Sequence, residues 1–316
     1  MQKHPIATIV NFCSNDARFI GACIEQASVF SSQIIVVLCD HFFDGTLENR
    51  TLLEEIYRAY PQCLFIEYPF IPSEIPRMMF NQITSAQFWH SCSRLLALQY
   101  LEASIEMVLF LDADEVPDGW RFFRWLNASD YRQHVVLKMA NYWYFREPIY
   151  QAQSWEDTVV LAQVRALSPE LLLQQDDRKA IYDLLPGPKR RNVCSSDGQP
   201  MFHHFSWVRT RDEMVKKVRT WGLKNDRDWI SLITQELAHT FQGTDFIHHY
   251  KYNIVPPPFL IDLELPPIFF PRCKDGYVIR ISQREFLDKL QFKENILPHW
   301  MSNLIKLLDF KTPFRR

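Results

Sequence analysis

Glycine, basic charge and long apolar runs are all in short supply in this sequence. Glycine accounts for 8 of the 316 residues, which argues against a glycine-lined loop that cradles phosphate groups. Lysine and arginine together number 35 against 37 acidic residues, so no basic field points to nucleic acid. The sequence has no run of about 18 apolar residues that would cross a membrane, and no signal peptide is expected at the N-terminus. A globular enzyme or binding protein is the class that remains.

Closely spaced cysteine pairs are also missing. The seven cysteines are Cys13, Cys23, Cys39, Cys63, Cys92, Cys194 and Cys273. Their scatter indicates reduced thiols in a reducing compartment, rather than a disulfide framework or a zinc site. We therefore expect a cytoplasmic protein.

One segment combines a short apolar run with clustered carboxylates. Val108–Leu111 leads directly into Asp112, Asp114 and Glu115. Such a run is typical of a strand buried on both faces of a sheet, and open α/β sheets bind ligands at the carboxyl ends of their strands. Bare carboxylates at this spacing are expected to repel one another, and such clusters often hold Mg²⁺ or Mn²⁺ together with substrate phosphates. A solvated acidic turn is the alternative interpretation.

Apolar runs and helical spacing alternate through the first half of the chain. The runs that predict strands are Ile6–Phe12, Ile34–Leu38, Cys63–Tyr68 and Met107–Leu111. The spacing between them predicts amphipathic helices. This alternation predicts an α/β fold with a mostly parallel central sheet flanked by helices.

The second half has a more mixed pattern. Strands are predicted at Val135–Phe145, Thr158–Val164 and Phe202–Val208, and helices at Asp212–Trp221, Trp229–His239 and Glu285–Phe310. Asp176–Pro188 is polar and is expected to form turns. Val255–Pro271 is rich in proline and is expected to be extended and irregular.

The order of four features resembles the GT-A glycosyltransferases, most closely the family 2 type. The features are Thr8–Asp16, Val36–Asp40 followed by Asp44-Gly45-Thr46, the Arg-x-x-Ala-Leu segment Arg94–Leu98, and the Asp-x-Asp segment Leu109–Glu115. The resemblance covers about the first 125 residues. In the second half, His204–Trp207 is similar to a segment of the family 17 N-acetylglucosaminyltransferases.

The chain departs from the family 2 pattern after its second strand. The family usually has an Asp-Asp-Gly-Ser-like loop there, whereas this chain has the bulkier and less acidic Cys39–Phe43. The exact contacts to the nucleobase are therefore not given by the resemblance.

The resemblance implies a GT-A-like fold and a transferase that moves a sugar from a nucleotide-sugar, with UDP favoured. Residues 1–125 would form the nucleotide-sugar-binding half, and residues 126–316 the acceptor half of one continuous domain. The acceptor would be a glycan, a lipid-linked sugar or a protein. Mn²⁺ or Mg²⁺ would bind Asp114 directly, and Asp112 would reach the ribose or the metal. Asp16, Asp40 and Arg94 would contact the nucleotide.

Two further roles are expected in the second half. A general base for the acceptor hydroxyl is predicted at Asp157 with its neighbour Glu156, and Asp226 and Asp228 are the second choice. For Asp157 the alternative is a structural role as the cap of a helix or strand.

A histidine is also expected to complete the metal site, and His203 and His204 are the candidates. Because they are adjacent on an extended segment, they should point to opposite faces, so at most one of them can reach the metal. The alternative is that both histidines are structural.

Two apolar features allow a binding role beside ordinary packing. The rings of Tyr142–Phe145 and Trp155 would stack against sugars, or would form the core of the sheet. Trp300, Leu304 and Leu308, followed by basic Lys311, Arg315 and Arg316, would rest on the inner face of a membrane, or would pack in the core.

Two other functions compete with glycosyl transfer. Leu109–Val116 matches the first motif of HAD-type phosphohydrolases, in which the first aspartate is the nucleophile. That motif normally lies on the first strand of its fold, whereas three strand-helix units precede it here. The third interpretation is a glycosyltransferase-like binding protein without turnover.

Overall fold

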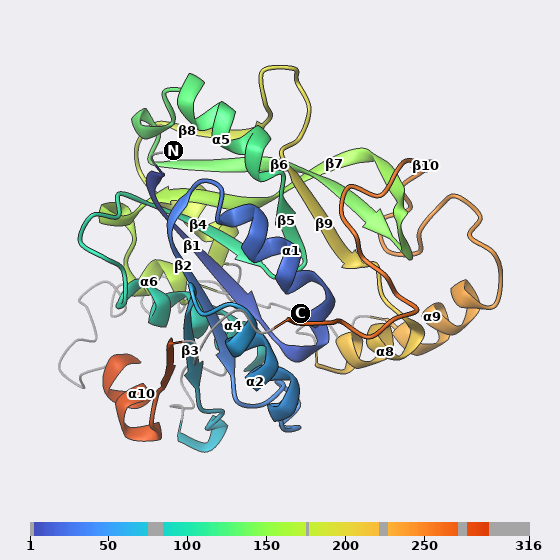
Figure 1. The fold of residues 1–316 in the computed structure, drawn as a ribbon, viewed down its shortest axis with the longest axis horizontal. Helices are drawn as coiled ribbons and strands as arrows, with labels where there is room; N and C mark the ends of the chain where they lie inside the picture. The colour runs from blue at the N-terminus through green and yellow to red at the C-terminus, as the bar shows by residue number, and fades with distance from the viewer. Residues whose placement is uncertain (1–2, 75–84, 175–176, 221–226, 271–276, 291–316) are drawn as a thin grey trace, which may run out of the picture.

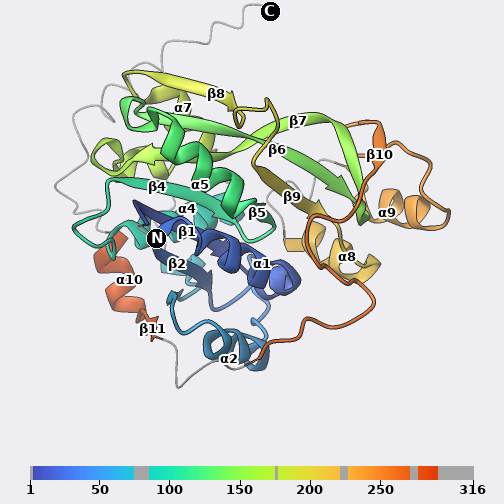
Figure 2. The ribbon, with the colours of Figure 1, turned by 45° about the horizontal axis from the view of Figure 1, so that its top comes forward.

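The computed structural model describes residues 3–74, 85–174, 177–220, 227–270 and 277–290, and Figures 1 and 2 show two views of it. Its strands are β1 (His4–Phe12), β2 (Ser31–Cys39), β3 (Leu64–Tyr68), β4 (Met107–Asp112), β5 (Glu115–Pro117), β6 (Val136–Phe145), β7 (Glu147–Gln163), β8 (Lys189–Val193), β9 (Phe202–Trp207), β10 (Tyr252–Ile254) and β11 (Tyr277–Arg280). Its helices are α1 (Ala17–Ala27), α2 (Arg50–Ala59), α4 (Ser85–Leu98), α5 (Gly119–Ala128), α6 (Pro169–Leu172), α7 (Asp177–Leu184), α8 (Arg211–Thr220), α9 (Trp229–Leu237) and α10 (Gln283–Leu290).

The strands form one sheet in the order β11-β3-β2-β1-β4-β7-β6-β9-β5, with β10 beside β7 and β8 beside β6. The pairs from β11 to β4 are all parallel. Beyond β4 the sheet is mixed, because β7 is antiparallel to both β4 and β6, whereas β9 is parallel to β6. The predicted α/β fold, parallel in its first half and mixed in its second, is confirmed.

Alternate residues of β4 enter two different cores, as expected for a strand that is buried on both faces. Val108 and Phe110 pack with residues of α4, α7 and α10 on one face of the sheet. Leu109 and Leu111 pack with residues of α1, α2 and α5 on the other face. All four side chains are fully buried. This packing fixes the direction in which β4 delivers Asp112 to the carboxyl edge of the sheet.

A third core of mainly aromatic side chains joins the mixed part of the sheet to α8 and α9. Trp143 and Phe145 from β6 pack there with Trp207 from β9 and with Trp229 from α9. Figures 1 and 2 show α8 and α9 beside the end of β9. Most of the aromatic strand Tyr142–Phe145 is therefore sheet core, since only Tyr142 is half-buried.

Two boundaries differ from those expected. β7 begins at Glu147, so residues 155–157 lie inside this strand rather than before it. The segment expected to form turns contains α7, whose Ile181 is buried while Lys179 and Asp183 are exposed. No helix among the described residues is long and apolar enough to span a membrane. Asp226 and the predicted membrane-contacting helix from Trp300 onward lie outside the described residues.

Candidate functional site

A pocket with a volume of about 320 Å³ opens at the carboxyl ends of β1, β2 and β4. Cys39 at the end of β2 and Asp112 at the end of β4 line it, as does Asp16 from the turn after β1. Lys217 from α8 and Arg178 from α7 also line the pocket. The pocket therefore lies at the edge where a parallel sheet is expected to bind a ligand.

Asp112 is held by cationic side chains from two helices. Its Oδ1 accepts a hydrogen bond from Arg94 Nη2 at 2.8 Å and lies 3.2 Å from His90 Nε2. His90 and Arg94 are four residues apart on α4, so they share one helix face. Oδ2 of Asp112 accepts from Arg178 Nη2 at 3.0 Å. Both oxygens of this carboxylate thus have a partner in the protein.

Glu115 is fully buried and holds the turn between β4 and β5 in place. Its Oε2 accepts from the backbone nitrogen of Asp112 at 2.8 Å, and its Oε1 accepts from Thr158 Oγ1 at 2.6 Å. Arg178 Nη1 donates to both oxygens, at 2.6 and 2.8 Å. Arg178 therefore links Glu115 to Asp112, and Glu115 orients the acidic turn rather than facing a ligand.

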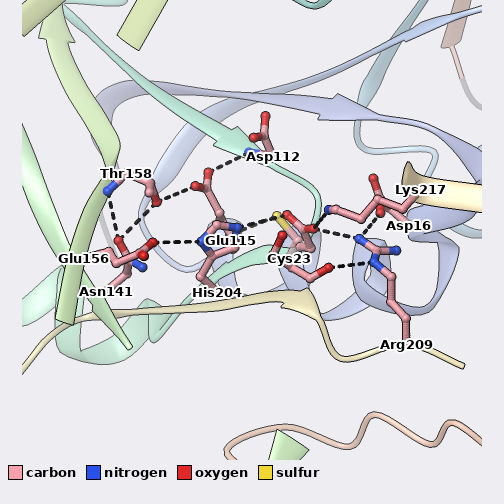
Figure 3. A network of polar contacts seen from close by, with 12 residues as sticks. Asp16, Cys23, Asp112, Glu115, Asn141, Glu156, Thr158, His204, Arg209 and Lys217 are labelled. Atoms are coloured by element: carbon pink, nitrogen blue, oxygen red, sulfur yellow. Dashed lines mark hydrogen bonds and ion pairs between the residues drawn. The ribbon is translucent and has the colours of Figure 1, made fainter. Parts of the chain in front are cut away.

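Asp114 is buried beside a second set of cations, of which Arg209 and Lys217 appear in Figure 3. Its Oδ2 accepts from Arg209 Nη2 at 2.7 Å and lies 3.3 Å from Lys217 Nζ. Its Oδ1 lies 3.7 Å from His204 Nε2. Arg209 is itself buried and also contacts Asp16 at 2.5 Å. The repulsion expected among the clustered carboxylates is thus relieved by side-chain cations of the protein.

These contacts set the charge state of the two aspartates. Burial alone would raise the pKa of Asp112, but Arg178, His90 and Arg94 outweigh burial and hold this pKa well below its usual value. Burial likewise opposes ionisation of Asp114, and Lys217, His204 and Arg209 lower its pKa to about 2. Both carboxylates are therefore ionised near neutral pH.

The two candidate bases, Glu156 and Asp157, are neighbours on β7, at a point where its pairing with β6 shifts register, and their side chains have different partners. Glu156 lies near His204, His248 and Tyr250: its Oε2 is 4.0 Å from His204 Nδ1, and its Oε1 is 3.5 Å from His248 Nε2 and 3.3 Å from Tyr250 Oη. Figure 3 shows Glu156 and His204 at one end of the polar network that also contains the acidic turn.

Asp157 makes a different set of contacts. Its carboxylate contacts Arg191 Nε at 2.8 Å and Lys138 Nζ at 3.0 Å. Glu156, and not Asp157, is thus the carboxylate that the strand brings to His204. Asp228, a second choice for the base, is the N-cap of α9 and accepts from the backbone nitrogen of Ser231.

The two adjacent histidines point in different directions, as expected for an extended segment. His204 reaches Asp114 and Glu156, and its Nδ1 is buried without a hydrogen-bond partner. His203 Nδ1 is 2.8 Å from Tyr144 Oη, and its ring lines a second pocket. Burial lowers the pKa of His203 to about 3, so its ring is neutral. Of the two, only His204 is placed beside the acidic turn.

The remaining predicted nucleotide contacts are placed unevenly. Asp16 lines the pocket and pairs with Arg209. Asp40 follows β2, where its Oδ1 accepts from the backbone nitrogen of Phe70 at 2.8 Å and lies 2.6 Å from His41 Nδ1. Arg94 is fully buried and contacts Asp112 rather than facing the open pocket. Arg94 thus positions a carboxylate.

The acidic turn does not suit a divalent metal as it stands. Mg²⁺ and Mn²⁺ need several oxygen ligands with open lone pairs, whereas Asp112 and Asp114 already pair with Arg94, Arg178, Arg209 and Lys217. A metal that displaced one of these charge-assisted hydrogen bonds would remove about 1.5–3 kcal/mol of stabilisation. Within the described ranges, no group of three or more His, Cys, Asp or Glu side chains is arranged to hold a metal ion. The Mn²⁺ or Mg²⁺ site stays a prediction, and the pairing of Asp112 and Asp114 with cations does not favour it.

The cations are the part of the site that sequence reasoning missed. His90 was readable in principle, because it precedes Arg94 by one helical turn. Arg178, Arg209 and Lys217 come from segments that are 66 to 103 residues away from the aspartate of the acidic turn that each of them contacts. No local pattern marks such partners, so only the fold shows them.

No family model and no curated protein matches the chain. Among solved structures, it is similar to 4-diphosphocytidyl-2C-methyl-D-erythritol synthase from Anaerococcus prevotii, with 9% identity over 68% of this chain and 95% of that one and a TM-score of 0.40. The glycosyltransferase GlyE from Streptococcus pneumoniae matches with 12% identity over 75% and 64% and a TM-score of 0.37. The catalytic domain of Drosophila beta1,4galactosyltransferase 7 matches with 10% identity over 75% and 82% and a TM-score of 0.34.

Two of these three proteins are glycosyltransferases. All three TM-scores lie below 0.5.

Proposed function

We propose that the protein is a glycosyltransferase that takes a sugar from a nucleoside-diphosphate sugar. The observation that carries this proposal is the pocket at the carboxyl edge of the sheet, where Arg178 and Lys217 line the wall beside Asp112. Cations fixed in a partly enclosed site suit a ligand with a diphosphate, whose negative charge increases as it leaves. A donor of this kind supplies both the leaving group and the sugar.

The other wall of the pocket suits a nucleoside. His41, Phe42 and Phe43 follow β2 and line the pocket. Their rings offer faces against which a nucleobase can stack. Asp40 anchors the start of this loop through Phe70, and its second carboxylate oxygen would accept a hydrogen bond from the base or ribose. UDP remains the favoured nucleotide because of the resemblance.

The acceptor would enter beside Glu156. In the transfer, the bond from the sugar to the diphosphate breaks and its electron pair stays on the diphosphate. A hydroxyl oxygen of the acceptor forms the new bond to the sugar, and its proton passes to Glu156 as general base. His204, which lies between Glu156 and Asp114, would help to fix the orientation of both carboxylates.

The phosphohydrolase alternative is less compatible with these contacts. It requires Asp112 to attack a phosphate, whereas both oxygens of Asp112 are engaged by cations. The acidic motif also lies on β4, after three strands in the chain. A binding protein without turnover keeps the same pocket, so only a measurement of turnover separates it from an enzyme.

A thermal-shift screen tests the proposed ligand class. Nucleoside diphosphates and nucleotide-sugars should raise the melting temperature by about 5 °C at about 100 times the dissociation constant, because they bind only the folded state. At the same concentration, nucleosides without phosphates should raise the melting temperature less, and sugar phosphates without a base should hardly raise it. If no nucleoside diphosphate or nucleotide-sugar shifts the melting temperature more than a sugar phosphate does, the proposal is wrong.

A further inference from the structure

We propose that protein cations, Lys217 and Arg178 above all, bind the diphosphate of the donor, so that donor binding needs no divalent metal. This inference rests on the proposed function, because it concerns the same pocket and the same ligand. It reverses the role expected for the acidic motif. Asp112 and Asp114 would position side-chain cations, and these cations, rather than a metal ion, would face the phosphates.

The first support is how the motif is partnered. Asp112 contacts a cation through each of its two oxygens, Arg94 through Oδ1 and Arg178 through Oδ2. Asp114 contacts Arg209 and Lys217 through Oδ2. A metal ion bound by these aspartates would lie next to four positively charged side chains, which would repel it. The same arrangement favours an anion, because the cations are already fixed in place.

The second support is the direction of these cations. Arg94 and Arg209 are buried and donate hydrogen bonds to Asp112 and Asp114. Lys217 and Arg178, by contrast, line the pocket, and their side chains keep 19% and 17% of their surface exposed. They come from α8 and α7, which are separate elements that meet at this pocket. A diphosphate between them would therefore meet positive charge from two elements.

Lys217 is the better of the two residues for a test. Arg178 also pairs with fully buried Glu115, so its loss would leave a buried carboxylate without a cation and would destabilise the fold. Lys217 donates to Asp114 at 3.3 Å, while Arg209 keeps a closer contact with the same oxygen. Lys217→Met keeps most of the length of the side chain and removes its charge. Arg219→Met, at an exposed position of the same helix, is the matched control.

The experiment is a calorimetric titration with the nucleoside diphosphate that gives the largest thermal shift, in EDTA and separately with Mn²⁺. We expect the wild type to bind with an affinity that EDTA does not change. Lys217→Met should weaken binding by about tenfold or more, as for a lost charge-assisted hydrogen bond. It should leave the affinity for the matching nucleoside unchanged. Arg219→Met should change the affinity by less than about twofold, as for a distant surface charge.

The outcomes separate this inference from the proposed function. Binding that appears only with Mn²⁺ would overturn the inference and leave the glycosyltransferase proposal standing. The inference would also be overturned if binding without metal were weakened to the same degree by Lys217→Met and by Arg219→Met. A general loss of positive charge would then explain the effect. Absence of binding in both buffers, for every nucleoside diphosphate in the screen, would overturn the proposed function and the inference with it.

Discussion

Glu156→Gln is expected to lower kcat by about 10²–10⁴-fold while the affinity for the donor stays nearly unchanged. Glutamine has the same shape as glutamate but cannot accept a proton from the acceptor. Glu156 lies near His204, His248 and Tyr250, rather than among the residues that line the donor pocket. The measurement is steady-state release of nucleoside diphosphate with water or a sugar as the acceptor, together with calorimetry of nucleoside diphosphate binding.

Asp157→Asn is the matched control for this variant. Asp157 is the next residue on β7, but it pairs with Arg191 and Lys138. We expect this variant to be less stable and to keep a kcat within a few-fold of the wild type. A large fall in kcat for Asp157→Asn, with little change for Glu156→Gln, would show that the base is Asp157.

Arg209→Met is expected to lower the free energy of unfolding by about 3–5 kcal/mol, because buried Asp114 loses its closer cation and half-buried Asp16 loses its contact with Arg209. Arg209 is buried between Asp16 and Asp114 and also donates to the backbone oxygens of Asn15 and Ser206. Methionine fills much of the same volume, so the loss reports charge and hydrogen bonds more than a cavity. The measurement is urea unfolding near neutral pH.

Arg211→Met is the control, since Arg211 is exposed and contacts Asp212 and Thr234 at the surface. We expect it to change stability by less than about 1 kcal/mol. A loss for Arg209→Met no larger than that for Arg211→Met would contradict the view that Arg209 compensates the buried acids.

The pH dependence of stability gives an independent check on Asp114. Its pKa is about 2 in the folded protein, below the value of about 3.9 that is usual for an unfolded chain. The resulting stability, about 2–3 kcal/mol, is fully present above about pH 5 and is lost as the pH falls through 2. In Arg209→Met the pKa of Asp114 in the folded protein should rise. The stability that Asp114 contributes, and that acid removes, should therefore be smaller than in the wild type. The measurement is the urea midpoint between about pH 5 and the acid limit of the native state. An unchanged pH profile would contradict the assigned contact.

The parallel half of the fold and the location of the acidic turn were predictable from the sequence. The alternation of apolar runs with helical spacing indicates which side chains of each strand and helix are buried. The apolar run before Asp112 is indeed buried on both faces of the sheet. The opposite directions of His203 and His204 followed from the period of a strand, and their contacts confirm that expectation.

The register of β7 and the cations of the site were not predictable in the same way. A shift of one residue decides whether Glu156 or Asp157 faces the site, and the sequence of β7 does not fix that register. The polar composition of the segment around α7 suggested turns, yet Arg178 of this helix reaches Asp112 and Glu115. Tertiary contacts of this kind depend on which distant segments the fold brings together.

The most direct test of the account is release of nucleoside diphosphate from a panel of nucleotide-sugars by the wild-type protein. Phosphomonoesters are assayed in parallel, and the nucleotide-sugar assays are run in EDTA and with Mn²⁺. The account predicts that at least one nucleotide-sugar is converted to a nucleoside diphosphate, in EDTA as well as with Mn²⁺, and that phosphomonoesters release no phosphate. Release of phosphate from phosphomonoesters without turnover of any nucleotide-sugar would contradict it.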